Sequence, residues 1–317
     1  MKKQILLSFL AGLVLPLLLA AVFPRVPPVP EAESESISPP AAEHDAGVVL
    51  TVRNRSGNLQ QLALREYLVG VVLAEMPADF GSEALKAQAV VARTYTCKRM
   101  EGSKHDAAAV CMDSGCCQGY RSPAEYLELG GKQAAVDKVR RAVEDTDALV
   151  LRYDGRLIDA TYFSCSGGST EDAVAVWGQD VPYLQAVESP GEEEAPRFTD
   201  AVEFSAAEFA ERLGLSSGGD PADWFGEVTY TDGGGVDTMV IRGREFSGTE
   251  LRSKLGLRST ALEISVDGGT ITVTTRGFGH RVGMSQYGAQ AMAEGGSGFR
   301  EILAHYYTGA ELVELTD

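Results

Sequence analysis

A single glutamate at the end of an apolar helical segment is the first candidate for chemistry. Residues 66–75 (EYLVGVVLAE) have the pattern of a helix, which Pro77 ends. Glu75 therefore lies at a break in the chain where a cleft can form. A carboxyl group that is half-buried there would have a raised pKa and could donate a proton to a leaving group. The alternative is a helix-terminal glutamate exposed to water.

Four residues of the types that bind soft metals follow in a segment with few apolar residues. They are His105, Cys111, Cys116 and Cys117, spaced H-x5-C-x4-C-C. Thiolates with imidazole are the donor set of zinc, although this spacing is not that of a standard zinc finger. A disulfide is the alternative, because this part of the chain is expected to lie outside the cytoplasm. The residues alone leave zinc and a disulfide open.

Two glycine-rich segments could let a ligand approach the backbone closely. Residues 163–170 (FSCSGGST) place a glycine pair among hydroxyl side chains, and a plain turn is the alternative. Residues 277–288 (GFGHRVGMSQYG) hold four glycines, one histidine and a Ser-Gln pair. His280 with Ser285 would suggest a hydrolase, but no G-x-S-x-G elbow surrounds the serine. A structural histidine in a glycine-rich turn is the alternative.

The elements that must position these residues are a mixture of helices and strand pairs. Helices are predicted over 66–75, over 82–100 with Ser82 as its N-cap, and over 132–146. Residues 197–275 contain a short helix and two strand pairs of their own, and we expect an inserted subdomain there. The predicted fold class is α+β, with a two-lobed catalytic domain over 47–317.

The N-terminal segment predicts attachment to a membrane. Two lysines precede a long uncharged run, so residues 1–23 are predicted to be a transmembrane signal anchor with a cytoplasmic N-terminus. A cleaved signal peptide is the alternative. Residues 24–46 are rich in proline and glutamate and are predicted to be a flexible linker. The rest of the chain would then be extracytoplasmic.

The composition excludes several classes of protein. The chain has 317 residues with 44% apolar and 23% charged residues, which is typical of a globular protein rather than a disordered one. Its formal net charge is −17. An acidic chain lacks the cationic face that sequence-independent nucleic-acid binding needs.

Three segments together resemble the stage II sporulation protein D family, which also includes the amidase enhancers. They are residues 67–96, containing LAEMP; residues 163–187, containing FSCSGGST; and residues 279–296, containing GHRVGMSQYG. They occur in the family's order and, with EILAHYYTG after them, cover most of residues 47–315. The segment 197–275 adds little to the resemblance.

The resemblance implies a peptidoglycan lytic transglycosylase that cleaves the β-1,4 bond between N-acetylmuramic acid and N-acetylglucosamine. The family's acid/base is the glutamate of the E-M-P block, here Glu75. One carboxyl group suffices because the sugar's own 6-hydroxyl attacks, giving a 1,6-anhydro end, whereas ordinary glycosidases need two. The matching blocks imply these substrate-binding residues: Arg93, Tyr162, Ser166, Gly167, His280, Ser285 and Gln286.

The resemblance also bears on the metal and on one departure from the family. Some sporulation members carry a zinc-bound loop between the first and second blocks, and His105, Cys111 and Cys117 are placed as its ligands would be. Cys116 would take the fourth position of a structural zinc site, unless a water does.

Arg281 stands where many relatives have a small residue, and it could narrow the cleft or contact a carboxylate on the substrate.

The implied setting is the engulfment machine of a sporulating cell. The partners would be peptidoglycan strands, a cell-wall amidase and a membrane protein of that machine. The alternative is a non-catalytic amidase enhancer, in which Glu75 and the glycine-rich block bind glycan without cutting it.

Overall fold

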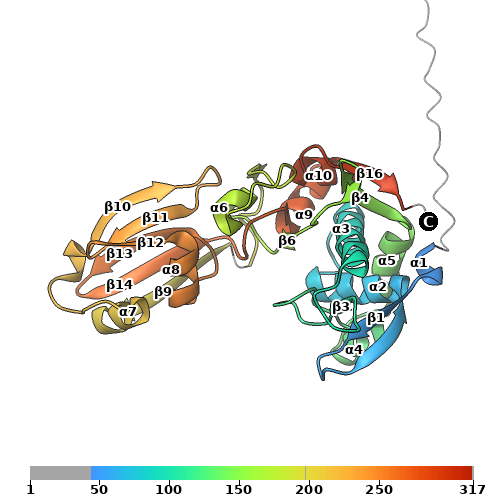
Figure 1. Cartoon of the computed structure of the whole chain (residues 1–317), viewed down its shortest axis with the longest axis horizontal. Helices are drawn as coiled ribbons and strands as arrows, with labels where there is room; N and C mark the ends of the chain where they lie inside the picture. Colours follow the sequence, from blue (N-terminus) through green and yellow to red (C-terminus); the bar gives the residue numbers. More distant parts are fainter. Residues whose placement is uncertain (1–43, 197, 316–317) are drawn as a thin grey trace, which may run out of the picture. The chain divides into compact units, whose positions relative to one another are not determined.

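The computed structural model describes residues 44–196 and 198–315 (Figure 1). The predicted anchor, 1–23, and most of the predicted linker, 24–46, lie outside these residues. Within the described ranges, no helix is both long enough and apolar enough to cross a membrane.

The described chain is mixed α and β with short helices and small sheets, as the sequence predicted. The helices are α1 (His44–Gly47), α2 (Leu64–Glu75), α3 (Ser82–Glu101), α4 (Pro123–Glu128), α5 (Gln133–Glu144), α6 (Ala173–Trp177), α7 (Ala206–Leu213), the 3-10 helix η1 (Pro221–Asp223), α8 (Gly248–Leu255), α9 (Gln286–Glu294) and α10 (Phe299–Tyr306). The strands are β1 (Val49–Arg53), β2 (Leu59–Ala63), β3 (Val110–Cys111), β4 (Leu149–Tyr153), β5 (Arg156–Leu157), β6 (Tyr162–Phe163), β7 (Gly168–Ser169), β8 (Glu188–Ser189), β9 (Thr199–Ser205), β10 (Phe225–Tyr230), β11 (Val236–Ile241), β12 (Arg244–Ser247), β13 (Ala261–Asp267), β14 (Thr270–Arg276), β15 (Met284–Ser285) and β16 (Glu311–Glu314).

The first hydrophobic core is built around α2, α3 and α5, which lie side by side (Figure 1). Helix α2 is buried on nearly every side, because its residues 67–73 carry no charge. Alanines at many buried positions of α3 allow its neighbours to approach closely. Helix α3 begins at Ser82, and its N-cap is Gly81 rather than the serine that we expected. The Gly81 N–H donates to Gln290 Oε1 at 2.6 Å, which ties the start of α3 to α9.

The first described residues belong to this core. The Asp147 carboxylate accepts hydrogen bonds from the backbone N–H groups of His44, at 2.9 Å, and Asp45, at 3.0 Å. The Asp45 side chain is fully buried and pairs with Arg93. The end of the segment that the sequence assigned to the linker is therefore helical and packed.

A second hydrophobic core is confined to the segment that the sequence marked as an insertion. It contains the sheets β10-β11-β12 and β13-β14-β9 with helices α7 and α8 (Figure 1). Strand β9 pairs antiparallel with β14, and Thr199 is opposite Arg276. The segment therefore begins and ends at neighbouring positions. Two of its three hairpins turn where the sequence places Asp-Gly-Gly, at 232–234 and 267–269, and the third, β11–β12, turns at 242–243.

The two glycine-rich blocks meet through a short parallel pairing of β6 with β15. Tyr162 lies opposite Met284, and Phe163 lies opposite Ser285. Gly283 makes this pairing possible, because its φ is +83° and a Cβ there would come within 2.2 Å of the Thr161 carbonyl oxygen. Segments more than a hundred residues apart are thereby joined beside the end of α2.

Candidate active site

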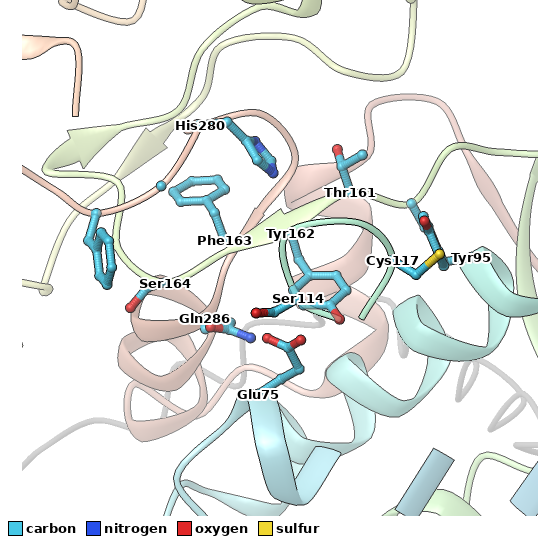
Figure 2. Close-up of a pocket in the computed structure, with 13 residues that line it drawn as sticks. Glu75, Tyr95, Ser114, Cys117, Thr161, Tyr162, Phe163, Ser164, His280 and Gln286 are labelled. Carbon is cyan, nitrogen blue, oxygen red and sulfur yellow. The ribbon is translucent and has the colours of Figure 1, made fainter. Parts of the chain in front are cut away.

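Glu75 lies between two adjoining pockets at the end of α2. One pocket has a volume of about 410 Å³ and the other about 470 Å³, and Glu75, Ser164, Phe278 and Gln286 line both of them. Among the described residues that line these pockets, Glu75 is the only carboxylic acid. Figure 2 shows its carboxyl group pointing into the first pocket toward Tyr162. The sequence prediction that Glu75 lies at a cleft agrees with this geometry.

The Glu75 carboxyl group is held by the segment that follows the cysteine cluster. The Gly119 N–H donates to Glu75 Oε1, and a Cβ at Gly119 would come within 2.8 Å of that oxygen. The Tyr162 hydroxyl faces the same carboxyl group, and its oxygen also lies 3.3 Å from Gln118 Oε1 (Figure 2). Gln118 in turn donates to Thr96 Oγ1 at 2.9 Å. A glycine is needed at 119 because only a bare backbone can approach so closely.

Burial raises the pKa of Glu75 above that of an ordinary glutamate. The hydrogen bonds from Gly119 and Tyr162 favour the charged form and lower the pKa, but the loss of hydration outweighs them. A carboxyl group with a raised pKa keeps its proton to a higher pH, as a general acid must.

His280 lines the first pocket as a neutral ring. Its Nδ1 accepts a hydrogen bond from the Val282 N–H at 3.1 Å, so the proton of the neutral ring is on Nε2. Burial and the nearby charge of Arg252 lower the pKa of His280 to about 4. The ring lies 5.6 Å from the ring of Phe163 and 5.4 Å from that of Trp177. The ring also has a hydrogen bond to the Tyr162 backbone, so both of its nitrogens are engaged by the protein, and it is uncharged at neutral pH.

Gln286 and Ser285 are neighbours in sequence but differ in access to the pockets. Gln286 is the first residue of α9 and lines both pockets. Ser285 is fully buried and is the N-cap of α9, where its hydroxyl accepts from the Gly288 N–H at 3.2 Å. Because Ser285 does not line the pockets, a Ser/His hydrolase built on Ser285 and His280 has no geometric support.

Arg93 is a correction to the set of expected glycan-binding residues. Its side chain is fully buried in α3 and lines neither pocket beside Glu75. Its guanidinium pairs with Asp45 Oδ2 at 2.7 Å and donates to the carbonyl oxygens of Leu149 and Val143, each at 3.1 Å. Arg93 therefore joins α3, α5, β4 and the N-terminal helix α1, and it is a structural residue.

Ser166 and Gly167 also lie outside the two pockets. Ser166 is fully buried and donates to Glu192 Oε1 at 2.9 Å, while its N–H donates to Glu192 Oε2 at 2.6 Å. A Cβ at Gly167 would come within 2.7 Å of the Arg276 backbone. Gly167 therefore allows two backbone segments to pack closely, while Gly168 begins the short strand β7.

Arg281 points away from the pockets, contrary to the expectation that it narrows the cleft or meets the substrate. Its guanidinium pairs with Glu171 Oε1 at 2.8 Å, and both side chains are almost completely buried. It also donates to the carbonyl oxygens of Ser166, at 2.7 Å, and Gly233, at 2.7 Å. The Gly235 N–H donates to the same Glu171 oxygen at 3.1 Å. Arg281 thus ties the two glycine-rich blocks to the β10–β11 turn.

The four predicted metal ligands form one cluster. One donor atom from each of His105, Cys111, Cys116 and Cys117 lies within 4.8 Å of all the others. His105 Nε2 is 3.2 Å from Cys117 Sγ and 3.6 Å from Cys116 Sγ. Tetrahedral zinc bond lengths place nitrogen and sulfur ligands about 3.5 Å apart. All five cysteines have free thiols, so the disulfide alternative is not seen, and the residues fit a bound metal ion.

The metal cluster and Glu75 are neighbours. Cys117 lines the first pocket together with Glu75 (Figure 2), and Gln118 and Gly119 follow it directly in the chain. A metal that fixes Cys117 would therefore also fix the Gly119 N–H that holds the Glu75 carboxyl group.

Several residues of the site were missed by the sequence reasoning. Gln118 and Gly119 carry a usable signal, since the residues after a metal ligand are held in place. Phe163 and Phe278 line the first pocket and flank the predicted residues. Arg121 lines the second pocket, and nothing in its local sequence marks it.

Fold and site define an α+β protein in which one partly buried carboxylic acid faces two pockets beside a His/Cys cluster. The model of the stage II sporulation protein family matches residues 53–153, which contain Glu75 and the cluster. Stage II sporulation protein D of Bacillus amyloliquefaciens is 39% identical over 288 residues, which cover 89% of this chain and 83% of the relative. Stage II sporulation protein D of Bacillus subtilis (strain 168) is 41% identical over 268 residues, covering 83% of this chain and 78% of the relative. An amidase enhancer of the same strain is 29% identical over 304 residues, covering 77% of this chain and 40% of the relative. The chain belongs to the stage II sporulation protein D family.

Proposed function

We propose that this chain is a peptidoglycan lytic transglycosylase that cleaves the β-1,4 bond from N-acetylmuramic acid to N-acetylglucosamine. One observation carries the proposal: Glu75, with its raised pKa, is the only carboxylic acid among the described residues of the two pockets. A hydrolase of the usual kind needs a second carboxylate to activate water or to attack the sugar. A reaction in which the substrate supplies its own nucleophile needs only one.

The proposed reaction has two proton transfers through the same carboxyl group. Protonated Glu75 donates its proton to the glycosidic oxygen as the bond from that oxygen to C1 of N-acetylmuramic acid breaks. The Glu75 carboxylate then takes the proton of the 6-hydroxyl while O6 bonds to C1. The products are a 1,6-anhydro-muramyl end and a free 4-hydroxyl on N-acetylglucosamine, and Glu75 regains its proton.

The other residues of the first pocket bind and orient the glycan in this proposal. The Gly119 N–H and the Tyr162 hydroxyl stabilise the Glu75 carboxylate between the two transfers. Gln286 offers its amide to sugar hydroxyl and acetamido groups, and the neutral His280 ring packs against the bound sugar. Arg93, Ser166, Gly167 and Ser285 are left out of the binding set, because they are packed in the fold.

A structural zinc is part of the proposal. His105, Cys111, Cys116 and Cys117 would hold it, and the ion would order a loop with little core of its own. No chemical step requires it. Metal analysis of the purified chain and of its Cys111→Ser variant tests the assignment, with one zinc per chain expected only in the former.

The place of action is proposed from the sequence and the family. The predicted anchor at 1–23 would hold the catalytic domain on the outer side of the membrane, where septal peptidoglycan is remodelled during engulfment. A cell-wall amidase that removes stem peptides and a membrane protein of the same machine would be its partners.

An amidase enhancer is the second candidate function, favoured by the relative of that name. In that case the pockets would bind glycan without cutting it, and Glu75 would be a binding residue.

Product analysis separates these functions. Full-length chain purified in detergent, as wild type and as Glu75→Ala, is incubated with peptide-free glycan strands, and the products are identified by mass spectrometry. We expect 1,6-anhydro-muramyl ends from the wild type alone. Reducing ends would show that water attacks, and bound but uncut glycan would favour the enhancer.

A further inference from the structure

Arg121 is the only basic residue with a permanent charge among the described residues that line the two pockets. It lines the second pocket with Glu75 and Gln286, and its side chain is partly buried. Its backbone N–H donates to the Gly70 carbonyl oxygen of α2 at 3.0 Å. The Arg121 backbone is therefore held against α2, the helix that ends at Glu75.

The Arg121 guanidinium has no carboxylate within 4.0 Å among the residues that the structure describes. Three buried or partly buried arginines of the same core or of the glycine-rich blocks have an acidic partner. Arg93 pairs with Asp45, Arg140 pairs with Glu66, and Arg281 pairs with Glu171.

Glu75 lines the same pocket as Arg121 but does not form an ion pair with it. The Glu75 carboxyl group is held by the Gly119 N–H, and it lies more than 4.0 Å from the Arg121 guanidinium nitrogens. The Arg121 charge is thus available to a ligand in the second pocket. The planar guanidinium fork matches the two oxygens of a carboxylate.

We propose that Arg121 binds a carboxylate of the glycan strand in the second pocket and makes the site selective for anionic glycan. This rests on the proposed glycan-binding function of the pockets. Two sources supply such a group. A peptide-free N-acetylmuramic acid carries a free lactyl carboxylate, whereas in a peptide-bearing strand that carbon is an amide and the carboxylates belong to the stem peptide.

A local cation is needed at such a site because the whole chain opposes an anionic ligand. The formal net charge is −17, which slows the approach of an anionic strand. Arg121 would offset this repulsion where the reacting bond must lie, and it would set the register of the strand by the position of its carboxylates.

The test measures binding rather than cleavage, so that it stands apart from the catalytic proposal. Full-length chain with Glu75→Gln, in detergent, is titrated by calorimetry with four ligands. They are a peptide-free glycan tetrasaccharide, its lactyl methyl ester, a peptide-bearing tetrasaccharide, and the same ligand with its peptide carboxylates amidated. The same titrations are made with Arg121→Gln and Arg121→Lys added.

We expect one free-acid ligand to bind about tenfold more tightly than its neutralised form, as a charge-assisted contact predicts. Arg121→Gln should remove this preference, and Arg121→Lys should keep part of it. If Arg121→Gln abolishes the acid preference only for the peptide-free ligands, Arg121 binds the lactyl carboxylate. If it does so only for the peptide-bearing ligands, Arg121 binds a carboxylate of the stem peptide. Arg156→Gln is the matched control, because Arg156 is exposed on β5 and lines neither pocket.

Two outcomes would overturn the proposal. One is an acid preference that Arg121→Gln leaves unchanged, and the other is the absence of binding by all four ligands. If the wild-type chain binds the acid but makes no anhydro product, the catalytic proposal fails while the role of Arg121 stands.

Discussion

The end of α2 and the glycine-rich blocks were both marked by the sequence as places for chemistry, but they are built differently. At the end of α2, the carboxyl group of Glu75 faces two pockets and its pKa is raised by burial. In the glycine-rich blocks, the side chains of Ser166, Ser285 and Arg281 point into the interior and make hydrogen bonds within the protein. Of the substrate-binding residues that the resemblance implied in these blocks, His280 and Gln286 line a pocket.

The difference shows that residues typical of active sites can serve either a reaction or the packing of the fold. A carboxylic acid buried without a cationic partner costs stability, so its presence at a pocket points to a reaction. Glycines beside small hydroxyl residues lower the cost of close backbone packing, whether the neighbour is a ligand or another strand. Mutations at the end of α2 should therefore lower activity, whereas mutations in the glycine-rich blocks should lower stability.

Replacing the acid should give the largest effect on activity. Glu75→Gln should lower the rate of glycan cleavage about 1000-fold, because the amide cannot donate and accept the proton. The free energy of unfolding should change by less than about 1 kcal/mol, since the amide oxygen can still accept from the Gly119 N–H. Rate measurements and denaturant titrations check both halves, and a normal rate would remove Glu75 from the mechanism.

Breaking the Arg281–Glu171 pair should give the largest effect on stability. Arg281→Met leaves the Glu171 carboxylate buried without its cation, which should cost about 3–5 kcal/mol of unfolding free energy. The double variant Arg281→Met/Glu171→Gln should recover part of this loss. Equal stability of wild type and single variant in urea titrations would show that the pair is not a structural tie.

The neutral, partly buried ring of His280 should make stability depend on pH. Its pKa is about 4 in the folded protein, and an unfolded histidine titrates near about 6.5. Between these values the unfolded chain binds more protons, so stability is complete above pH ~6.5 and falls as the pH drops toward ~4. The loss should be about 2 kcal/mol, allowing for partial exposure of the ring. His280→Gln should flatten this part of the pH profile, and an unchanged slope would contradict the assignment.

The smallest effect is expected at the N-cap of α9. Ser285→Ala removes the acceptor for the Gly288 N–H and should cost about 1 kcal/mol of unfolding free energy. Cleavage by the folded variant should stay within about twofold of wild type, since Ser285 lines no pocket near Glu75. A thousandfold loss of rate in a folded protein would revive the Ser/His hydrolase instead.

Local patterns of the sequence were sufficient for the elements and for the central residue. The helix that ends at Glu75 follows from an apolar run stopped by a proline, and the turns at 154–155, 232–234 and 267–269 follow from their Asp-Gly pairs. The separate core of the inserted segment follows from its own alternating strands. These features depend on neighbours in the chain, which a sequence displays directly.

Only the tertiary structure decided which polar side chains reach the pockets. Arg93 and Arg121 are both arginines near the first block, yet Arg93 is buried against Asp45 and Arg121 faces a pocket. Arg281 likewise finds its partner Glu171 more than a hundred residues earlier in the chain. The reason is physical: whether a charge is paired, buried or available to a ligand depends on groups brought from distant parts of the chain, and local spacing holds no record of them.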